Sequence, residues 1–276
     1  MNSPPLSAIA RHELVLNVRN KWTLTFAVAF GALVLAVAYV GIQAEGYSGL
    51  QNFTRTSVSI LNLVLYIVPL VALTMGTLSF TGDKGSAELL FSQPVSRSQV
   101  LLGKFLGLFL SMVLSTLGGF SVAGFVIGLQ SGVAGLVRYG LLVVLSLGLS
   151  LAFLSLAVLV AVASKRKAKA FGVALFLWFF FVLFYDLVVI GGIQLVPRGA
   201  SNVLLFLSLL GNPVGMVRVS SLIILDNVTI FGAPGAALLR FFGGSLASLI
   251  ALIVSLALWV AVPILIARRL LQKQDI

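Results

Sequence analysis

Six long apolar runs dominate the pattern along the chain, and short polar or glycine-rich segments separate them. A helix needs about 20 residues to cross the hydrocarbon core of a bilayer, and each run is close to that length. We therefore predict an all-α polytopic membrane protein with six transmembrane helices. The predicted spans cover residues 22–42, 58–80, 105–129, 136–163, 170–193 and 241–267.

Turn-forming residues lie between these runs, as the span model requires. They are found at 43–46, 130–132, Gly191-Gly192 and Gly243-Gly244. The whole chain, 1–276, is predicted to be one transmembrane domain. Three of its segments lie outside the spans: an interfacial helix at 1–21, a polar segment at 81–104 and a segment at 192–240 before the last span.

Basic residues are distributed unevenly between the two sides of this topology. If the N-terminus lies inside, thirteen of the 18 Lys and Arg residues fall on the inner side and five on the outer side. Lys and Arg accumulate in cytoplasmic loops, so we expect both termini to be cytoplasmic. The basic run SKRKAKA, 164–170, then acts as a cytoplasmic anchor, with contact to anionic lipid or a partner as the alternative. The five outer residues are Arg55, Arg138, Arg198, Arg218 and Arg240.

A further apolar stretch, Val203 to Ile224, does not fit a seventh span. It is broken by Gly211-Asn212-Pro213 and carries Arg218. A seventh span would also place Arg268 and Arg269 outside, against the charge rule. We predict a re-entrant hairpin or two short helices near the outer surface, because non-helical backbone at that depth must be covered by protein or water.

The composition excludes several classes of function. The chain is 60% hydrophobic and 9% charged, so its net charge of +11 reflects membrane orientation, and no nucleic-acid partner is expected. With no cysteine there is no disulfide, thiolate metal site or cysteine nucleophile. The single Gly-Lys pair, Gly103-Lys104, is followed by Phe105 and makes no phosphate-binding loop. The single histidine, His12, forms no metal pair. We expect no enzyme activity, metal or cofactor in this chain.

The polar segment between the second and third spans is the most informative stretch. It reads FTGDKGSAELLFSQPVSRSQVLLGKFLG from Phe80 to Gly107. A short helix with an apolar face at the membrane surface is suited to dock into another protein. The alternative is a solvated loop with a few leucines. The residues that we assign to docking are Asp83, Lys84, Glu88, Leu89, Leu90, Phe91 and Arg97.

Asp186 is the exception to the near absence of acidic residues in the spans. An ionisable group inside a membrane is a functional hypothesis by default. The alternative is a structural pair with Arg198, Arg240 or a hydroxyl at the outer interface. We prefer the structural role, because Gly191-Gly192 places Asp186 near the end of its span.

The first 20 residues carry no cleavable signal pattern and do not form a clean amphipathic stripe. At helical spacing Leu6, Ile9 and Leu16 share a face, whereas Leu14 and Val18 do not. An interfacial helix is still expected, because of its location beside the first span.

The segment KGSAELLFSQPVSRSQVLLGKFLG resembles the stretch between the second and third spans of ABC-2 type ABC transporter permeases. That family pattern has the form E-x-G-T-L-E-L-L-L-S-x-P-V-S-R-x-x-x-L-L-G-K. This chain departs from it at Asp83-Lys84, where a Glu often stands, and at Ser86-Ala87. The matching residues are Gly85, Glu88, Leu89, Leu90, Ser92, Pro94, Val95, Ser96, Arg97, Leu101, Leu102, Gly103 and Lys104.

The resemblance implies a permease in a bacterial inner membrane. It would pair with a second copy of itself, and each copy would rest on a cytoplasmic ATPase that binds ATP and magnesium. The segment from Lys84 to Phe91 would be the coupling helix. Within the family, the overall likeness is to permeases that serve maturation of the copper enzyme nitrous-oxide reductase. That implies a sulfur species as cargo, or force passed to a periplasmic accessory protein through 192–240, with Arg198, Arg218 and Asp226 as contacts. The runner-up interpretation is a membrane scaffold without transport.

Overall fold

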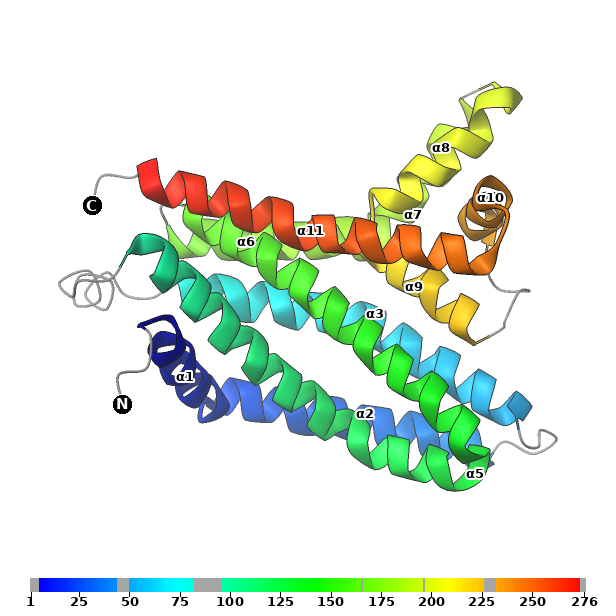
Figure 1. Cartoon of the computed structure of the whole chain (residues 1–276), viewed down its shortest axis with the longest axis horizontal. Coiled ribbons are helices and arrows are strands. Elements are labelled where there is room, and N and C mark those ends of the chain that lie inside the picture. Colours follow the sequence, from blue (N-terminus) through cyan, green and yellow to red (C-terminus); the bar gives the residue numbers. More distant parts are fainter. Residues whose placement is uncertain are drawn as a thin grey trace.

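The computed structural model describes residues 5–43, 50–81, 96–164, 166–195, 197–225 and 232–273, and every regular element among them is helical. Figure 1 shows these helices as an elongated bundle. They are α1 (Pro5–Val18), α2 (Lys21–Gln43), α3 (Leu50–Phe80), α5 (Arg97–Ala163), α6 (Lys167–Phe179), the π-helix η1 (Phe180–Phe184), α7 (Tyr185–Gln194), α8 (Arg198–Leu210), α9 (Pro213–Ile224), α10 (Gly232–Phe242) and α11 (Ser245–Lys273).

Among the residues that the structure describes, six helical segments are long and apolar enough to cross a membrane, or seven if the bent pair α8–α9 counts as one span. This agrees with the predicted all-α fold of six spans and a broken element before the last. The six segments are α2, α3, the two arms of α5, the continuous run α6–η1–α7, and α11. The second and third begin before the predicted spans, at Leu50 and Arg97, because polar residues extend both helices by further turns.

The two arms of α5 meet at Gly132, inside the predicted turn at 130–132. Gly132 has φ 67°, a left-handed conformation that glycine adopts without a steric penalty from a Cβ atom. The arms pack closely below this turn, where Tyr139 Oη donates to the carbonyl of Phe120 at 2.9 Å. Gly132 therefore makes a tight helical hairpin from the third and fourth spans.

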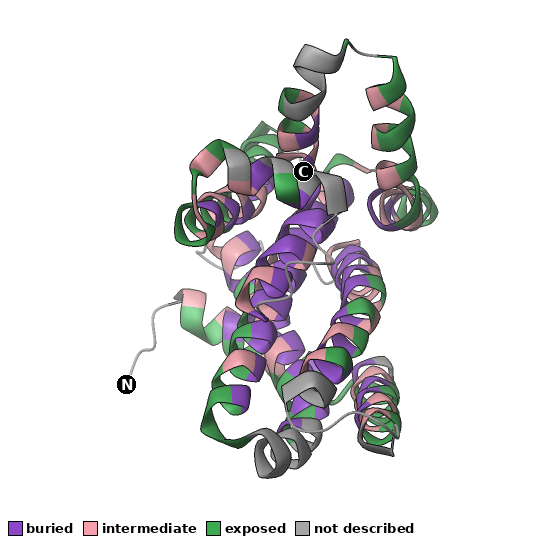
Figure 2. Ribbon diagram, turned by 90° about the vertical axis from the view of Figure 1, so that its right-hand side faces the viewer, coloured by how far each residue is buried: buried purple, intermediate pink, exposed green. Residues whose placement is uncertain are grey.

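The bundle has two distinct ends. We call the end where both termini lie the terminal end; α3 finishes there, and α5 begins there (Figure 1, left). We call the opposite end, which contains Gly132, the hairpin end. Buried residues concentrate where α3, α5 and α9 face one another, and exposed residues line the outer faces of the bundle (Figure 2).

The predicted start of the last span at Phe241 is wrong. α10 ends at Phe242, and α11 begins at Ser245 after Gly243, which has φ 69°. Phe241 stacks on Phe206 of α8 with ring centroids 4.6 Å apart. The hydrophobic run continues through this break because α10 is itself apolar, so hydropathy alone could not separate the two helices.

α8 and α9 form the broken element that was predicted before the last span. Their axes bend by 103° at Gly211-Asn212, and each helix is too short to cross a membrane by itself. α9 packs on α5 and α11, whereas α8 leans away from the bundle axis toward α10 (Figure 1).

Candidate functional site

The predicted coupling residues Asp83, Lys84, Glu88, Leu89, Leu90 and Phe91 lie outside the described residues. The structure places the two points where this segment joins the bundle, Thr81 after α3 and Ser96 before α5. Ser96 caps α5 reciprocally. Its Oγ accepts from the Gln99 backbone N–H at 3.3 Å, and its own backbone N–H donates to Gln99 Oε1 at 3.0 Å. The C-terminal attachment of the segment is thus a fixed helix start.

The start of α5 is bonded to the end of α11. Arg97 Nη1 donates to the carbonyl of Leu271 at 3.2 Å. Arg268 Nε and Gln272 Nε2 both donate to Ser98 Oγ, at 3.0 and 3.3 Å. Arg97, which sequence reasoning assigned to docking on a partner, therefore also ties the start of α5 to the end of α11.

α1 lies against the first turns of α5 by close backbone approach. A Cβ atom added at Gly103 would lie 2.9 Å from Ile9 Cβ, and one added at Gly107 would lie 2.7 Å from Glu13 Cβ. Residues four apart share one face of a helix, so Gly103 and Gly107 form a groove for α1. Side chains at these positions would push α1 away from α5.

Glu13 holds α1 to the end of α3. Only 9% of Glu13 is exposed, and its Oε1 accepts from Ser79 Oγ at 2.6 Å and from Asn17 Nδ2 at 3.0 Å. A buried carboxylate needs such partners, and removal of a partner or of the charge is destabilising. Sequence reasoning missed Glu13. The signal that the sequence offered was the rarity of acidic residues: Glu13 is one of only seven.

These contacts define a terminal-end frame, made of α1, the end of α3, the start of α5 and the end of α11. The undescribed segment 82–95 is attached to two of these four helices, and the other two are bonded or packed directly to them. The segment is therefore attached to a frame of four helices that are joined by direct contacts.

A second polar cluster lies where α8 meets α9. Asn212 is 2% exposed, and its Oδ1 accepts from the Val214 backbone N–H at 3.0 Å as the N-cap of α9. Its Nδ2 donates to the carbonyl of Phe181 in η1 at 3.1 Å. The Asn212 side chain thus provides a hydrogen-bond partner for a backbone N–H at the start of α9 and for a carbonyl of the π-helix. Backbone groups at membrane depth need such partners.

Side chains from two other helices satisfy the last carbonyls of α8. Trp259 Nε1 donates to the carbonyl of Leu210 at 3.0 Å, and Tyr185 Oη donates to the carbonyl of Ser208 at 2.7 Å. The terminal carbonyls of a helix have no partner within the helix, so these two donors allow α8 to end inside the protein. We call Asn212, Trp259 and Tyr185 together the apex cluster.

The apex cluster continues into α5 through a proline in α11. Pro263 lacks a backbone N–H and leaves the carbonyl of Trp259, four residues earlier, without its helical donor. Ser155 Oγ lies 2.9 Å from that carbonyl and 2.7 Å from the carbonyl of Ala152 in its own helix, so its one hydroxyl hydrogen can donate to either of them. The turn of α11 before Pro263 is thereby bonded to the fourth span.

Asp186 and Arg218 form an ion pair beside the apex cluster. Arg218 Nη1 donates to Asp186 Oδ2 at 2.7 Å, and the two side chains are 35% and 48% exposed respectively. The structure pairs Asp186 with Arg218, whereas sequence reasoning proposed Arg198, Arg240 or a hydroxyl; the side chains of Arg198 and Arg240 lie outside the described residues. Arg198 begins α8, and Asp226 lies outside the described residues.

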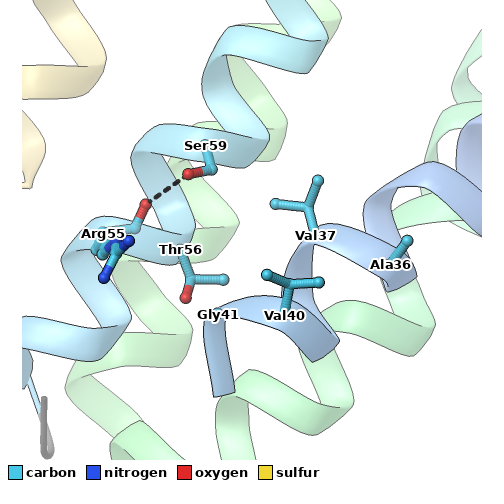
Figure 3. A pocket seen from close by; sticks show the side chains of 7 residues that line it. All are labelled: Ala36, Val37, Val40, Gly41, Arg55, Thr56 and Ser59. Atoms are coloured by element: carbon cyan, nitrogen blue, oxygen red, sulfur yellow. Dashed lines mark hydrogen bonds between the residues drawn. The ribbon is translucent and has the colours of Figure 1, made fainter. Parts of the chain in front are cut away.

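A groove opens between α2 and α3 at the hairpin end, with a volume of about 320 Å³ (Figure 3). Val37 and Val40 form its apolar side, and Arg55 and Ser59 line its other wall. The two helices touch closely at its edge, because a Cβ atom on Gly41 would overlap the side chain of Thr56. The groove lies apart from the terminal-end frame and from the apex cluster.

Metal-binding chemistry finds no support in the described parts of the chain. No group of three or more His, Asp or Glu side chains lies close enough there to hold an ion.

Comparison with known proteins gives two consistent results. The family model described as "ABC-2 family transporter protein" matches residues 7–276. A Pseudomonas aeruginosa protein named "Probable ABC transporter permease protein NosY" is 33% identical over 280 residues, which cover 99% of this chain and 100% of that protein. A Stutzerimonas stutzeri protein of the same name is 32% identical over 274 residues, 96% of this chain and 97% of that one.

Proposed function

Since the chain belongs to the ABC-2 family of transporter permeases, we propose that it couples ATP hydrolysis on a separate cytoplasmic ATPase to helix movement in a bacterial inner membrane. The chain is the membrane-embedded subunit, and ATP and magnesium would bind to the ATPase. The observation that carries this proposal is the insert between α3 and α5, anchored in a frame that joins four helices. A push on this insert would reach the whole bundle.

The cytoplasmic side in this proposal is the terminal end. Charged side chains at helix ends there are predominantly basic, and Lys and Arg collect on the cytoplasmic side of membranes. This orientation places 82–95 where a soluble ATPase can reach it. Reporter fusions test it. We expect cytoplasmic signals at Arg97, Lys167 and Lys273 and periplasmic signals at Ala44, Ser131 and Ala200. A periplasmic signal at Lys273 would overturn the orientation.

The segment with Leu89, Leu90 and Phe91 would be the coupling helix. An isolated helix of this length is marginal in water, so a groove of the ATPase must stabilise it. Glu88 and Lys84 would meet charges on the rim of that groove. ABC ATPases close as dimers, and a second copy of this chain would give each ATPase subunit its own coupling helix.

The cargo proposed is a sulfur species for assembly of the copper-sulfide cluster of nitrous-oxide reductase. Its support is the overall likeness of this sequence to permeases that serve that maturation. Force passed to a periplasmic accessory protein through 192–240 is the other form of this proposal. Export of another small molecule or lipid, and a scaffold role without transport, are the alternatives.

The experiment compares ATPase copurification for two double variants in mild detergent. Leu89→Ala with Leu90→Ala should weaken ATPase binding. Loss of one buried anchor typically costs about 2 kcal/mol or more, a factor of about 30 in affinity. The matched control is Leu110→Ala with Leu114→Ala, two exposed leucines of α5 that lie away from the insert. The control should retain the ATPase. Wild-type copurification and wild-type enzyme maturation by the first variant would reject the coupling role.

A hydrolysis-deficient ATPase separates the transporter from the scaffold. If this chain only organises an assembly complex, maturation should continue with an ATPase that binds ATP but does not hydrolyse it. Under the transporter proposal maturation stops, although the complex still assembles.

A further inference from the structure

The ion pair between Asp186 and Arg218 lies at a depth where exposed charge is unusual. The depth of the pair in the membrane can be measured along α11. The first charged residue of this helix is Arg268, nine residues after Trp259. At about 1.5 Å per residue this is about 14 Å, close to half of a hydrocarbon core about 30 Å thick. With Arg268 at the membrane surface, Trp259 lies near the middle of the membrane.

The pair itself lies about 8 Å from that middle level, toward the hairpin end. The Phe181 and Trp259 rings are 5.4 Å apart, so Phe181 shares the depth of Trp259. Asp186 follows Phe181 by five residues, or about 8 Å of helix. Arg218 follows Asn212, which bonds to Phe181, by six residues, or about 9 Å. Both side chains therefore lie within the hydrocarbon layer.

Charge exposed at this depth is not expected to face lipid. Charged groups inside membranes face protein or water-filled cavities, because hydrocarbon offers them no hydrogen bonds. Asp186 is 48% exposed and Arg218 35% exposed on this chain alone. The exposed side of the pair therefore meets water, or protein within an assembly, and not lipid.

The pair also joins two elements that otherwise have little contact. α7 packs on η1 and α8, whereas α9 packs mainly on α5 and α11. η1 lies directly before α7, and such π-helical turns are common at functional sites in proteins. The ion pair is thus a bond from the splayed α7–α8 hairpin to α9, which belongs to the bundle.

We propose that the Asp186–Arg218 pair is a latch facing a water-filled passage in the outer half of the membrane, closed in this structure and opened when α7 moves away from α9. This proposal rests on the proposed permease function but concerns a different part of the chain from the ATPase contact. It assigns the pair to the passage wall, where a hydrated ion pair can separate at small cost because water replaces the lost bond.

The first test is reaction with a membrane-impermeant, water-borne thiol reagent, in a chain that has no native cysteine. Thiolates are the reactive form and exist only where water reaches, so Asp186→Cys and Arg218→Cys should react about tenfold or more faster than a lipid-facing cysteine. The matched control is Val254→Cys on α11. Val254 is 55% exposed and lies five residues from Trp259, at the depth of Asp186. Equal rates at all three positions would overturn the proposal.

The second test locks the pair. The double variant Asp186→Cys with Arg218→Cys is joined by a short reducible bis-methanethiosulfonate, which spans more than a disulfide does. We expect the cross-link to abolish enzyme maturation, and a reducing agent to restore it. Each single variant, treated in the same way, should keep its untreated activity. Full activity of the cross-linked protein would show that α7 and α9 do not separate, and would refute the latch.

If the double variant failed to insert and assemble, the pair would be needed for folding, and this result would also count against the latch. The reagent test needs neither ATPase nor cargo. A permease without the proposed ATPase contact would therefore fail the copurification experiment and could still pass this one, so the two failures can be told apart.

Discussion

Replacement of Asn212 should be among the most destabilising single changes at the apex cluster. Asn212→Ala removes the N-cap of α9, which typically contributes about 1 kcal/mol. It also leaves the carbonyl of Phe181 without the donor that now lies 3.1 Å away, at a cost of about 1–3 kcal/mol for a buried group. Together these effects predict a loss of about 3 kcal/mol, which corresponds to a fall in Tm of about 10 °C for a chain of this size.

Asn212→Ser separates the two contributions. A serine hydroxyl can cap α9, but it is too short to reach the Phe181 carbonyl as well, so Asn212→Ser should fall between wild type and Asn212→Ala. The matched control is Asn62→Ala, an exposed asparagine of α3. Its effect should stay within about 0.5 kcal/mol, as is usual for surface changes.

Thermal unfolding of the purified protein in detergent, followed by tryptophan fluorescence, measures these differences. The reasoning requires the order wild type, Asn212→Ser, Asn212→Ala. An Asn212→Ala protein as stable as Asn62→Ala would mean that water or backbone adjustment satisfies both groups, and the bonding scheme of the apex cluster would be wrong.

Three further predictions concern single side chains. Asp186→Asn should keep enzyme maturation, since the amide oxygen still accepts from Arg218; an inactive but well-assembled variant would contradict the structural role and favour proton relay or cargo binding. Glu13→Gln should keep a Tm close to that of the wild type, because the amide oxygen still accepts from Ser79. Glu13→Ala should lower the free energy of unfolding by about 2–4 kcal/mol. Equal stability of the two variants would contradict this. Trp259→Phe removes the N–H that bonds to Leu210 and the part of the indole ring that phenylalanine does not replace, and should lower stability by about 1 kcal/mol or more, measured in the same unfolding assay.

The spans could be predicted from the sequence because bilayer thickness imposes a length on each apolar run. The helical hairpin at Gly132 followed from its turn residues. The break between α10 and α11 was misplaced because both helices are apolar on either side of Gly243, and a hydropathy window averages across a two-residue interruption.

The N-terminal helix shows why amphipathicity was a poor guide. Its buried stripe consists of Ala10, Glu13 and Asn17, whereas Leu16 is 53% exposed. A helix that packs by small and polar residues, into a groove of glycines, gives no hydrophobic periodicity to detect. Sequence reasoning found the helix by its location and missed the buried carboxylate that fixes it.

The partners of Asp186 and Asn212 could not be deduced because they depend on three-dimensional proximity. Arg218 is 32 positions from Asp186 in the chain, and Asn212 is 31 positions from Phe181. The sequence marked Asn212 as a helix breaker and Arg218 as an outer charge. Only the bend between α8 and α9 brings both back to the fifth span.

The contacts of α1 impose an order on biogenesis. α1 leaves the ribosome before the helices that hold it, because its hydrogen-bond partner Ser79 and its glycine groove at Gly103 and Gly107 are synthesised much later. Glu13 lacks Ser79 until the second span has been made, and it lacks the covering surface of α5 until the third span has been made, so it must first stay solvated at the membrane surface. α1 can therefore dock only after the segment at 82–95 has been made, and the terminal-end frame is complete only when α11, the last long helix, has reached the start of α5.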